Sequence, residues 1–176
     1  MQVHVASEHG AILTMGCDDD TNVSTVRVWR LDSTAANAWQ AVLCACVTVD
    51  AHITCAAVPS HLSDVALGLG DGRVYVLHAL SDSMHAKEPH IIKPKLAREA
   101  SFVDESTEPD VVTGLVIDAS TLLIATVSCT LKFTLHGPRG GQAPSVIDTI
   151  GCPPRCGAAF RTCAATEAKD LSLIHI

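Results

Sequence analysis

Aromatic side chains are scarce in this chain of 176 residues: they make up 3% of the sequence, and Tyr occurs once. Dense clusters of Lys and Arg are missing as well, and the formal net charge is -7. Nucleic-acid-binding proteins need basic surfaces, and those that hold single strands also need rings on which bases stack. The composition therefore argues against nucleic acid as a partner.

Long apolar runs are also missing. A membrane-spanning helix needs about 20 mostly apolar residues, and no such run occurs. The N-terminal segment MQVHVASEHG lacks the basic region and apolar stretch of a secretion signal. Without such a signal, the eight cysteines are expected to be reduced thiols that pack as small hydrophobes. Six lie mostly within apolar, strand-like runs: Cys17, Cys44, Cys46, Cys55, Cys129 and Cys163.

Small aliphatic residues dominate what is present. Hydrophobic residues make up 48% of the chain and charged residues 18%, enough apolar material for one packed domain. Short runs of Val, Ile, Leu and Thr between turn residues predict β-strands, and helical periodicity is absent beyond a possible turn near 33–39. Strands are expected at 11–17, 25–32, 40–49, 52–58, 64–69, 73–79, 90–96, 111–118, 122–128, 131–136 and 146–150.

These strands recur in groups of four. The third strands begin near Val26, Val74 and Leu131, and the intervals approach the roughly 40 to 50 residues of propeller blades once the acidic insertion 97–110 is set aside. Runs that are apolar at nearly every position, such as LLIATV, predict sheets buried on both faces. We therefore predict an all-β fold, a partial WD-like β-propeller of about three four-stranded antiparallel blades in an open, truncated ring.

The chain divides into six segments on this interpretation. The last six residues, LSLIHI, have the sequence of a translated sequencing adapter and are set aside as an artefact. The segments are 1–50, one or more partial blades; 51–96, a blade; 97–110, the acidic insertion; 111–152, a blade; 153–170, the start of the next blade; and 171–176, the artefact.

The glycine-rich segment 68–72 shares its glycines with phosphate-binding loops, but it lacks the Lys-Ser/Thr of a P-loop and precedes a strand instead of a helix. Asp71 and Gly72 instead predict a hairpin turn in which both central residues take positive φ. The insertion at 99–110 is interpreted either as an unstructured acidic loop or as a docking loop.

Metal and catalytic sites are not expected. Cys152 and Cys156 could supply half of a zinc site, but no second well-spaced pair follows, so a rigid connection between blades is the preferred interpretation. The acidic run 18–20 lacks the Gly and closing Glu of a calcium loop. The nine histidines do not occur in nucleophile contexts. An enzyme or metal protein that uses Cys152 and Cys156 is kept as a minor alternative.

An ordered set of four motifs resembles the N-terminal propeller of the vacuolar protein sorting-associated protein 11 family, core subunits of the HOPS and CORVET tethering complexes. The motifs are TVRVWRLD, VALGLGDGRVYVL, VVTGLVID and IGCPPRCGAAF, within residues 11–160. Because Trp29 is followed by Arg30, the Trp-Asp signature is incomplete and the propeller is a divergent one. The resemblance rests on Val26, Val28, Trp29, Gly68, Asp71, Gly72, Thr113, Gly114, Gly151, Cys152, Arg155 and Cys156.

The resemblance implies a non-enzymatic scaffold that acts in vesicle docking and fusion and in protein transport to the late endosome and the lysosome or vacuole. It implies a cytoplasmic protein, peripheral on those membranes, whose partners are other tethering-complex subunits, with small GTPases or SNAREs reached indirectly. In that family zinc is bound only by a C-terminal RING domain outside this segment, so no cofactor is expected here. The alternative is a WD-like scaffold of another complex, such as a ubiquitin-ligase substrate adaptor.

Overall fold

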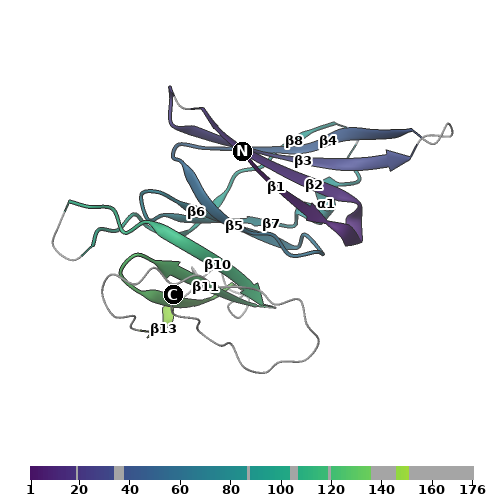
Figure 1. Cartoon of the computed structure of the whole chain (residues 1–176). Helices are drawn as coiled ribbons and strands as arrows, with labels where there is room; N and C mark the ends of the chain where they lie inside the picture. Colours follow the sequence, from purple (N-terminus) through teal and green to yellow (C-terminus); the bar gives the residue numbers. More distant parts are fainter. Residues whose placement is uncertain are drawn as a thin grey trace.

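Short aliphatic runs separated by turn residues fold into three β-sheets that lie one against the next (Figure 1). The structure is a computed structural model, and it describes residues 1–18, 20–33, 38–86, 88–103, 107–118, 120–135 and 146–150. The predicted all-β fold is confirmed: the sheets form an open partial β-propeller.

The first sheet has the strand order β1-β2-β3-β4-β8. Its first four strands form an antiparallel meander, and the short β8 pairs with β4 in parallel. At the β2–β3 turn, one carboxylate oxygen of Asp18 accepts a hydrogen bond from the Thr21 hydroxyl at 2.9 Å. The strands are β1 (Gln2–Ala6), β2 (Ala11–Asp18), β3 (Val23–Ser33), β4 (Trp39–Val49) and β8 (His90–Ile91).

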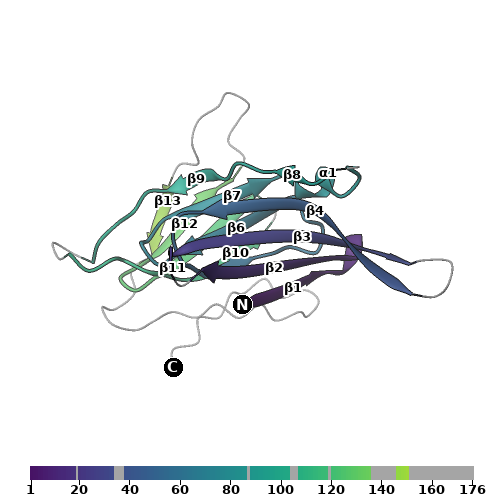
Figure 2. The ribbon, with the colours of Figure 1, turned by 90° about the horizontal axis from the view of Figure 1, so that it is seen from above.

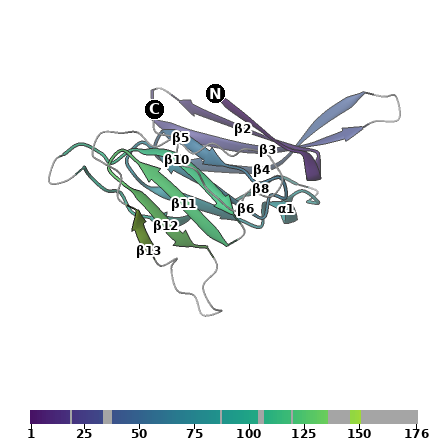
Figure 3. The same cartoon turned by 60° about the horizontal axis from the view of Figure 1, so that its bottom comes forward.

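The second and third sheets have the orders β5-β6-β7-β9 and β10-β11-β12-β13, each an antiparallel meander. Figure 3 shows the four strands of the third sheet side by side. The second sheet contains β5 (Ile53–Ala57), β6 (Asp64–Leu69), β7 (Val74–His78) and β9 (Lys95–Arg98). The third contains β10 (Val112–Asp118), β11 (Thr121–Thr126), β12 (Thr130–Thr134) and β13 (Val146–Ile150). Two single helical turns, η1 (Ser7–His9) and α1 (Leu80–Ser83), complete the described elements.

The predicted strand at 90–96 is wrong as a single element. His90–Ile91 joins the first sheet, whereas Lys95–Arg98 pairs with β7 and takes the fourth place in the second sheet. Pro94 lies between them, and proline cannot donate a hydrogen bond to a strand ladder, so the run is split. Strand β1 was not predicted at all.

The second sheet lies between the other two and shares a core with each. Its β6 is buried at all six positions. Leu67 and Leu69 pack with residues of the first sheet, such as Leu13 and Val28. Ala66 packs with residues of the third sheet, such as Ile124. Since side chains alternate along a strand, one strand supplies both cores.

Candidate interaction surfaces

The turn between β6 and β7 differs from the prediction. Only Gly72 has positive φ, at 87°, and Asp71 does not. The Gly72 N–H donates to the Leu69 carbonyl at 3.2 Å, and the Leu69 N–H donates to the Arg73 carbonyl at 3.0 Å. This is a three-residue loop, in which a type I turn is followed by one left-handed residue. The expectation of positive φ at both central residues is therefore wrong, although the turn itself is where it was placed.

The Asp71 carboxylate organises the residues after this turn. It accepts hydrogen bonds from the Arg73 backbone N–H at 3.0 Å and from Arg73 Nε at 2.6 Å. Arg73 Nη1 lies 2.9 Å from the Asp50 carboxylate, and the guanidinium carbon lies 5.7 Å from the centre of the Tyr75 ring. Asp71 thus positions the Arg73 guanidinium beside Asp50, in the β4–β5 connection that joins the first and second sheets.

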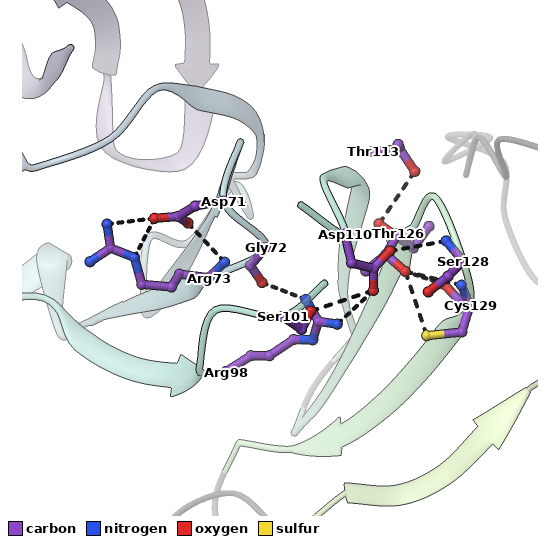
Figure 4. Close-up of polar contacts among 11 residues, drawn as sticks. Asp71, Gly72, Arg73, Arg98, Ser101, Asp110, Thr113, Thr126, Ser128 and Cys129 are labelled. Atoms are coloured by element: carbon purple, nitrogen blue, oxygen red, sulfur yellow. Dashed lines mark hydrogen bonds and ion pairs between the residues drawn. The ribbon is translucent and has the colours of Figure 1, made fainter. Parts of the chain in front are cut away.

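A buried ion pair joins the second sheet to the third (Figure 4). Arg98, at the end of β9, donates from Nη2 to the Asp110 carboxylate at 2.8 Å and from Nη1 to the Gly72 carbonyl. The side chains of Arg98 and Asp110 are 11% and 3% exposed. The other carboxylate oxygen of Asp110 accepts from the Ser128 N–H of the third sheet at 3.0 Å. Asp110 therefore bridges the hairpin turns of two neighbouring sheets.

The β11–β12 turn of the third sheet, which contains Ser128, is closed by its own hydrogen bonds, also visible in Figure 4. The Thr126 hydroxyl donates to the Cys129 carbonyl at 3.0 Å and accepts from the Cys129 N–H at 3.0 Å. The Thr113 hydroxyl donates to the Ala125 carbonyl at 3.3 Å and ties β10 to β11. These contacts hold the turn in the shape in which its Ser128 N–H meets Asp110.

Gly68 marks the closest approach of β6 to β10. A Cβ atom at Gly68 would lie 2.6 Å from Val112 Cγ1 and 2.8 Å from Cys55 Sγ. Burial in this contact raises the pKa of the Cys55 thiol, and a hydrogen bond from Thr54 opposes that shift only partly. The thiol here packs as a small hydrophobe.

Some of the motif residues that suggested the family lie at contacts between sheets, such as Gly68 against Val112. Val26 and Val28 are buried between the first two sheets, whereas Trp29 lies on the opposite face of β3. Gly114 follows a register shift in β10. Gly151, Cys152, Arg155 and Cys156 lie outside the described residues, as do the segments 153–170 and 171–176.

Sequence reasoning missed the Arg98–Asp110 pair. A signal was present, because opposite charges stand at the end of one strand and just before the next, near the two ends of the insertion 97–110. What the sequence does not show is that the two ends return to the same point.

The described part of the insertion is a short hairpin and not a structureless loop. The Asp110 N–H donates to the Ser101 carbonyl at 2.8 Å, and the Val103 N–H donates to the Glu108 carbonyl at 2.9 Å. Phe102 and Pro109 form a β-bridge, and Phe102 is 57% exposed.

The face of the first sheet that points away from the second carries several exposed apolar side chains. Directly paired residues share a face, so Val3, Val5, Trp29, Leu43 and Ile91 lie together on this one. The Trp29 indole N–H donates to the Thr14 hydroxyl at 3.0 Å, so both polar groups have a partner on the face itself. Val5 is 69% exposed and Ile91 is 89% exposed. Such a surface is typical of a protein contact.

Metal-binding groups of three or more His, Cys, Asp or Glu residues do not occur in the part of the chain that the structure describes. Within the same residues, no helix has the length and apolar character that crossing a bilayer requires. Cys17, Cys44, Cys46, Cys55 and Cys129 are free thiols.

The chain matches a known protein family. The model of the PEP5/VPS11 N-terminal family matches residues 1–169. The chain belongs to this family. The PEP5/VPS11 match includes β1, which precedes the four sequence motifs, and it extends over all thirteen described strands. No curated protein matches the chain significantly.

Membership of the PEP5/VPS11 N-terminal family places the chain in a subunit of a multi-subunit membrane-tethering complex. The stacked sheets, the buried bridge between them and the open apolar face suit a domain that works by presenting surfaces.

Proposed function

We propose that this chain is a non-enzymatic scaffold segment of a HOPS- or CORVET-type tethering complex. It acts in vesicle docking and fusion, and so in protein transport to the late endosome and the lysosome or vacuole. The observation that carries the proposal is the family match over residues 1–169.

The mechanism is positional. Three sheets share two cores, and Asp110 bridges the turns of the second and third, so partners bound to different sheets would be held at fixed separations. Packed interiors have low compressibility and transmit load. No covalent step, metal or cofactor is needed for such a role.

Partners and location follow from the same proposal. The direct partners are other subunits of the tethering complex, and small GTPases or SNAREs are reached through them. The protein is cytoplasmic and sits on late endosomal, lysosomal or vacuolar membranes through the complex. Four of the large apolar residues that are exposed, Val3, Val5, Trp39 and Ile91, lie on one face of the first sheet and support a role in protein contacts.

Reconstitution tests the proposal. The full-length protein is co-expressed with the remaining subunits of the complex, and the purified assembly is assayed for clustering of fluorescent vesicles. We expect the protein to copurify with the other subunits and clustering to depend on it. A full-length protein that remains monomeric beside an assembled complex contradicts the proposal.

A variant with a weakened propeller gives the matched comparison. Asp110→Ala breaks the bridge between sheets, whereas Gly16→Ala changes an exposed position with no atom within 4 Å of the added Cβ. We expect reduced clustering with the first variant and normal clustering with the second.

A further inference from the structure

The two longest strands of the chain leave the sheet to which they belong. β2 pairs with β3 as far as Arg30, but β3 and β4 continue to pair with each other up to Ser33 and Trp39. Figure 2 shows this ribbon projecting beyond the end of β2 at the right. We call residues 31–33 and 39–41 the arm.

The base of the arm is held in place. The Leu31 N–H donates to the Gly10 carbonyl at 2.9 Å. The Arg30 guanidinium donates hydrogen bonds to both carboxylate oxygens of Asp32, at 2.7 and 2.9 Å. It also donates to the carbonyl of Met84, which follows α1. The arm therefore leaves the sheet in a defined direction.

The two faces of the arm differ in character. Asp32 and Gln40 lie on the face that continues the covered side of the first sheet, where the arm has passed the last residues of the shared core. Leu31, Ala41 and Trp39 lie on the other face, which continues the open apolar side. An exposed apolar face on a two-stranded ribbon indicates an interaction site.

Trp39 is the most prominent residue of this face, with 72% of its surface exposed. Tryptophan is highly buried on average and is the residue most enriched at energetic centres of protein interfaces. The other tryptophan, Trp29, is partly buried and has a hydrogen-bond partner. A sheet with strands as short as β6 and β7, which have six and five residues, would cover the body of the first sheet but would not extend along the arm to Trp39.

The one charged side chain of the arm, Asp32, is balanced by Arg30 at its base. Arg30 and Asp32 are paired, and residues 33–41 carry no charged side chain. The hydrogen bond from Arg30 lowers the pKa of the Asp32 carboxyl, which keeps the pair ionised. The Trp39 side chain, with only paired charges at the base of its arm, is therefore complementary to an uncharged apolar pocket and not to a charged one.

We propose that the arm is a docking element whose Trp39 side chain inserts into an apolar, uncharged pocket on another subunit of the tethering complex. The inference rests on the proposed function, which supplies that subunit. Its binding is expected to depend little on ionic strength, because screening acts on charges.

Hydroxyl-radical footprinting of the full-length protein, alone and assembled with the remaining subunits, tests the proposal. The oxidation rate of Trp39 is read by tandem mass spectrometry, with Tyr75 of the second sheet as internal reference. We expect Trp39 to be oxidised rapidly in the free protein and several-fold more slowly in the assembly. Equal rates in both overturn the proposal, and so does protection already in the free protein, which would show that the arm docks on its own chain.

Two variants complete the test. Trp39→Ala is expected to weaken capture by the remaining subunits about tenfold or more, as truncation of a central interface tryptophan does. Gln40→Ala changes the adjacent, exposed residue on the opposite face of the arm and is expected to leave capture unchanged at low and high salt. Equal capture of both variants contradicts the docking role while leaving the proposed function intact. Failure of the unaltered protein to assemble overturns both.

Discussion

The second and first sheets differ in how many of their faces are covered. In the second sheet β6 is buried at every position, and its sequence is apolar almost throughout. In the first sheet β3 alternates, with buried Val26 and Val28 on either side of exposed Arg27. Coverage of one face or two therefore decides whether a strand reads as an alternating or a continuous pattern.

The bridge between sheets offers the largest expected effect. Asp110→Ala leaves the buried Arg98 guanidinium without its counter-charge and should lower the free energy of unfolding by about 3 to 5 kcal/mol. Urea denaturation measures the loss. Adding Arg98→Met should recover much of it, because no unpaired charge remains. Within the first sheet, Asp32→Ala breaks a solvent-exposed pair and should have a much smaller effect. Equal losses for the two pairs would remove the distinction between junction and surface.

Truncation of a leucine tests the two-sided burial of the middle sheet. Leu67 is fully buried, so Leu67→Ala should cost about 2 to 5 kcal/mol through lost transfer energy and the cavity that remains. Val5, which is 69% exposed on the first sheet, is the control, and Val5→Ala should stay within about 0.5 kcal/mol. Urea midpoints of both variants decide the matter, and a comparable shift for Val5→Ala would show that the outer face is covered.

Two glycines sharpen the comparison. At Gly68 an added Cβ would meet Val112 Cγ1 at 2.6 Å, so Gly68→Ala should destabilise the chain by about 1 to 3 kcal/mol through overpacking. At Gly16, on the open face, an added Cβ meets nothing within 4 Å, and Gly16→Ala should be neutral or slightly stabilising. Thermal melts report both. Val112→Ala in the Gly68→Ala background should restore part of the loss, and no rescue would contradict the packing argument.

The smallest effect concerns pH. Burial lowers the pKa of His4 from its ordinary value of 6.5, beside a cavity of about 310 Å³ lined by Ala57, Leu115 and Ile117. The unfolded chain therefore takes up the proton first as the pH falls below 6.5, so His4 destabilises the fold there and contributes nothing above that pH. The stability difference between the unaltered chain and His4→Gln, followed from pH 8 to pH 5, should change only below about 6.5. A difference that is constant with pH would show that His4 titrates alike in both states.

The sequence predicts the middle strands of the second and third sheets well because near-complete burial leaves continuous aliphatic runs. β6 and β11 are examples, and so is the turn at Gly72, where a left-handed residue is required. β1 escaped detection because it is an edge strand with only Ala6 buried, which weakens its pattern.

Other features could not be predicted because they depend on contacts between distant residues. The parallel pairing of Ile91 with Cys46 joins strands 45 residues apart in sequence, and nothing local specifies it. The bridge from Asp110 to Ser128 likewise depends on how two turns meet. Apolar side chains on the open face of the first sheet, such as Val5 and Ile91, lie outside both cores, and residue type alone does not distinguish them from core residues.

The short strand β8 has a mechanical consequence. After α1 the chain leaves the second sheet, pairs with β4 of the first and then returns as β9, with a further bond from the Ile92 N–H to the Cys46 carbonyl at 3.0 Å. The two sheets are thus joined by backbone hydrogen bonds as well as by side-chain packing. Amide protons of β4 and β6 should exchange with solvent in one shared opening event, because the two sheets then open as a single cooperative unit.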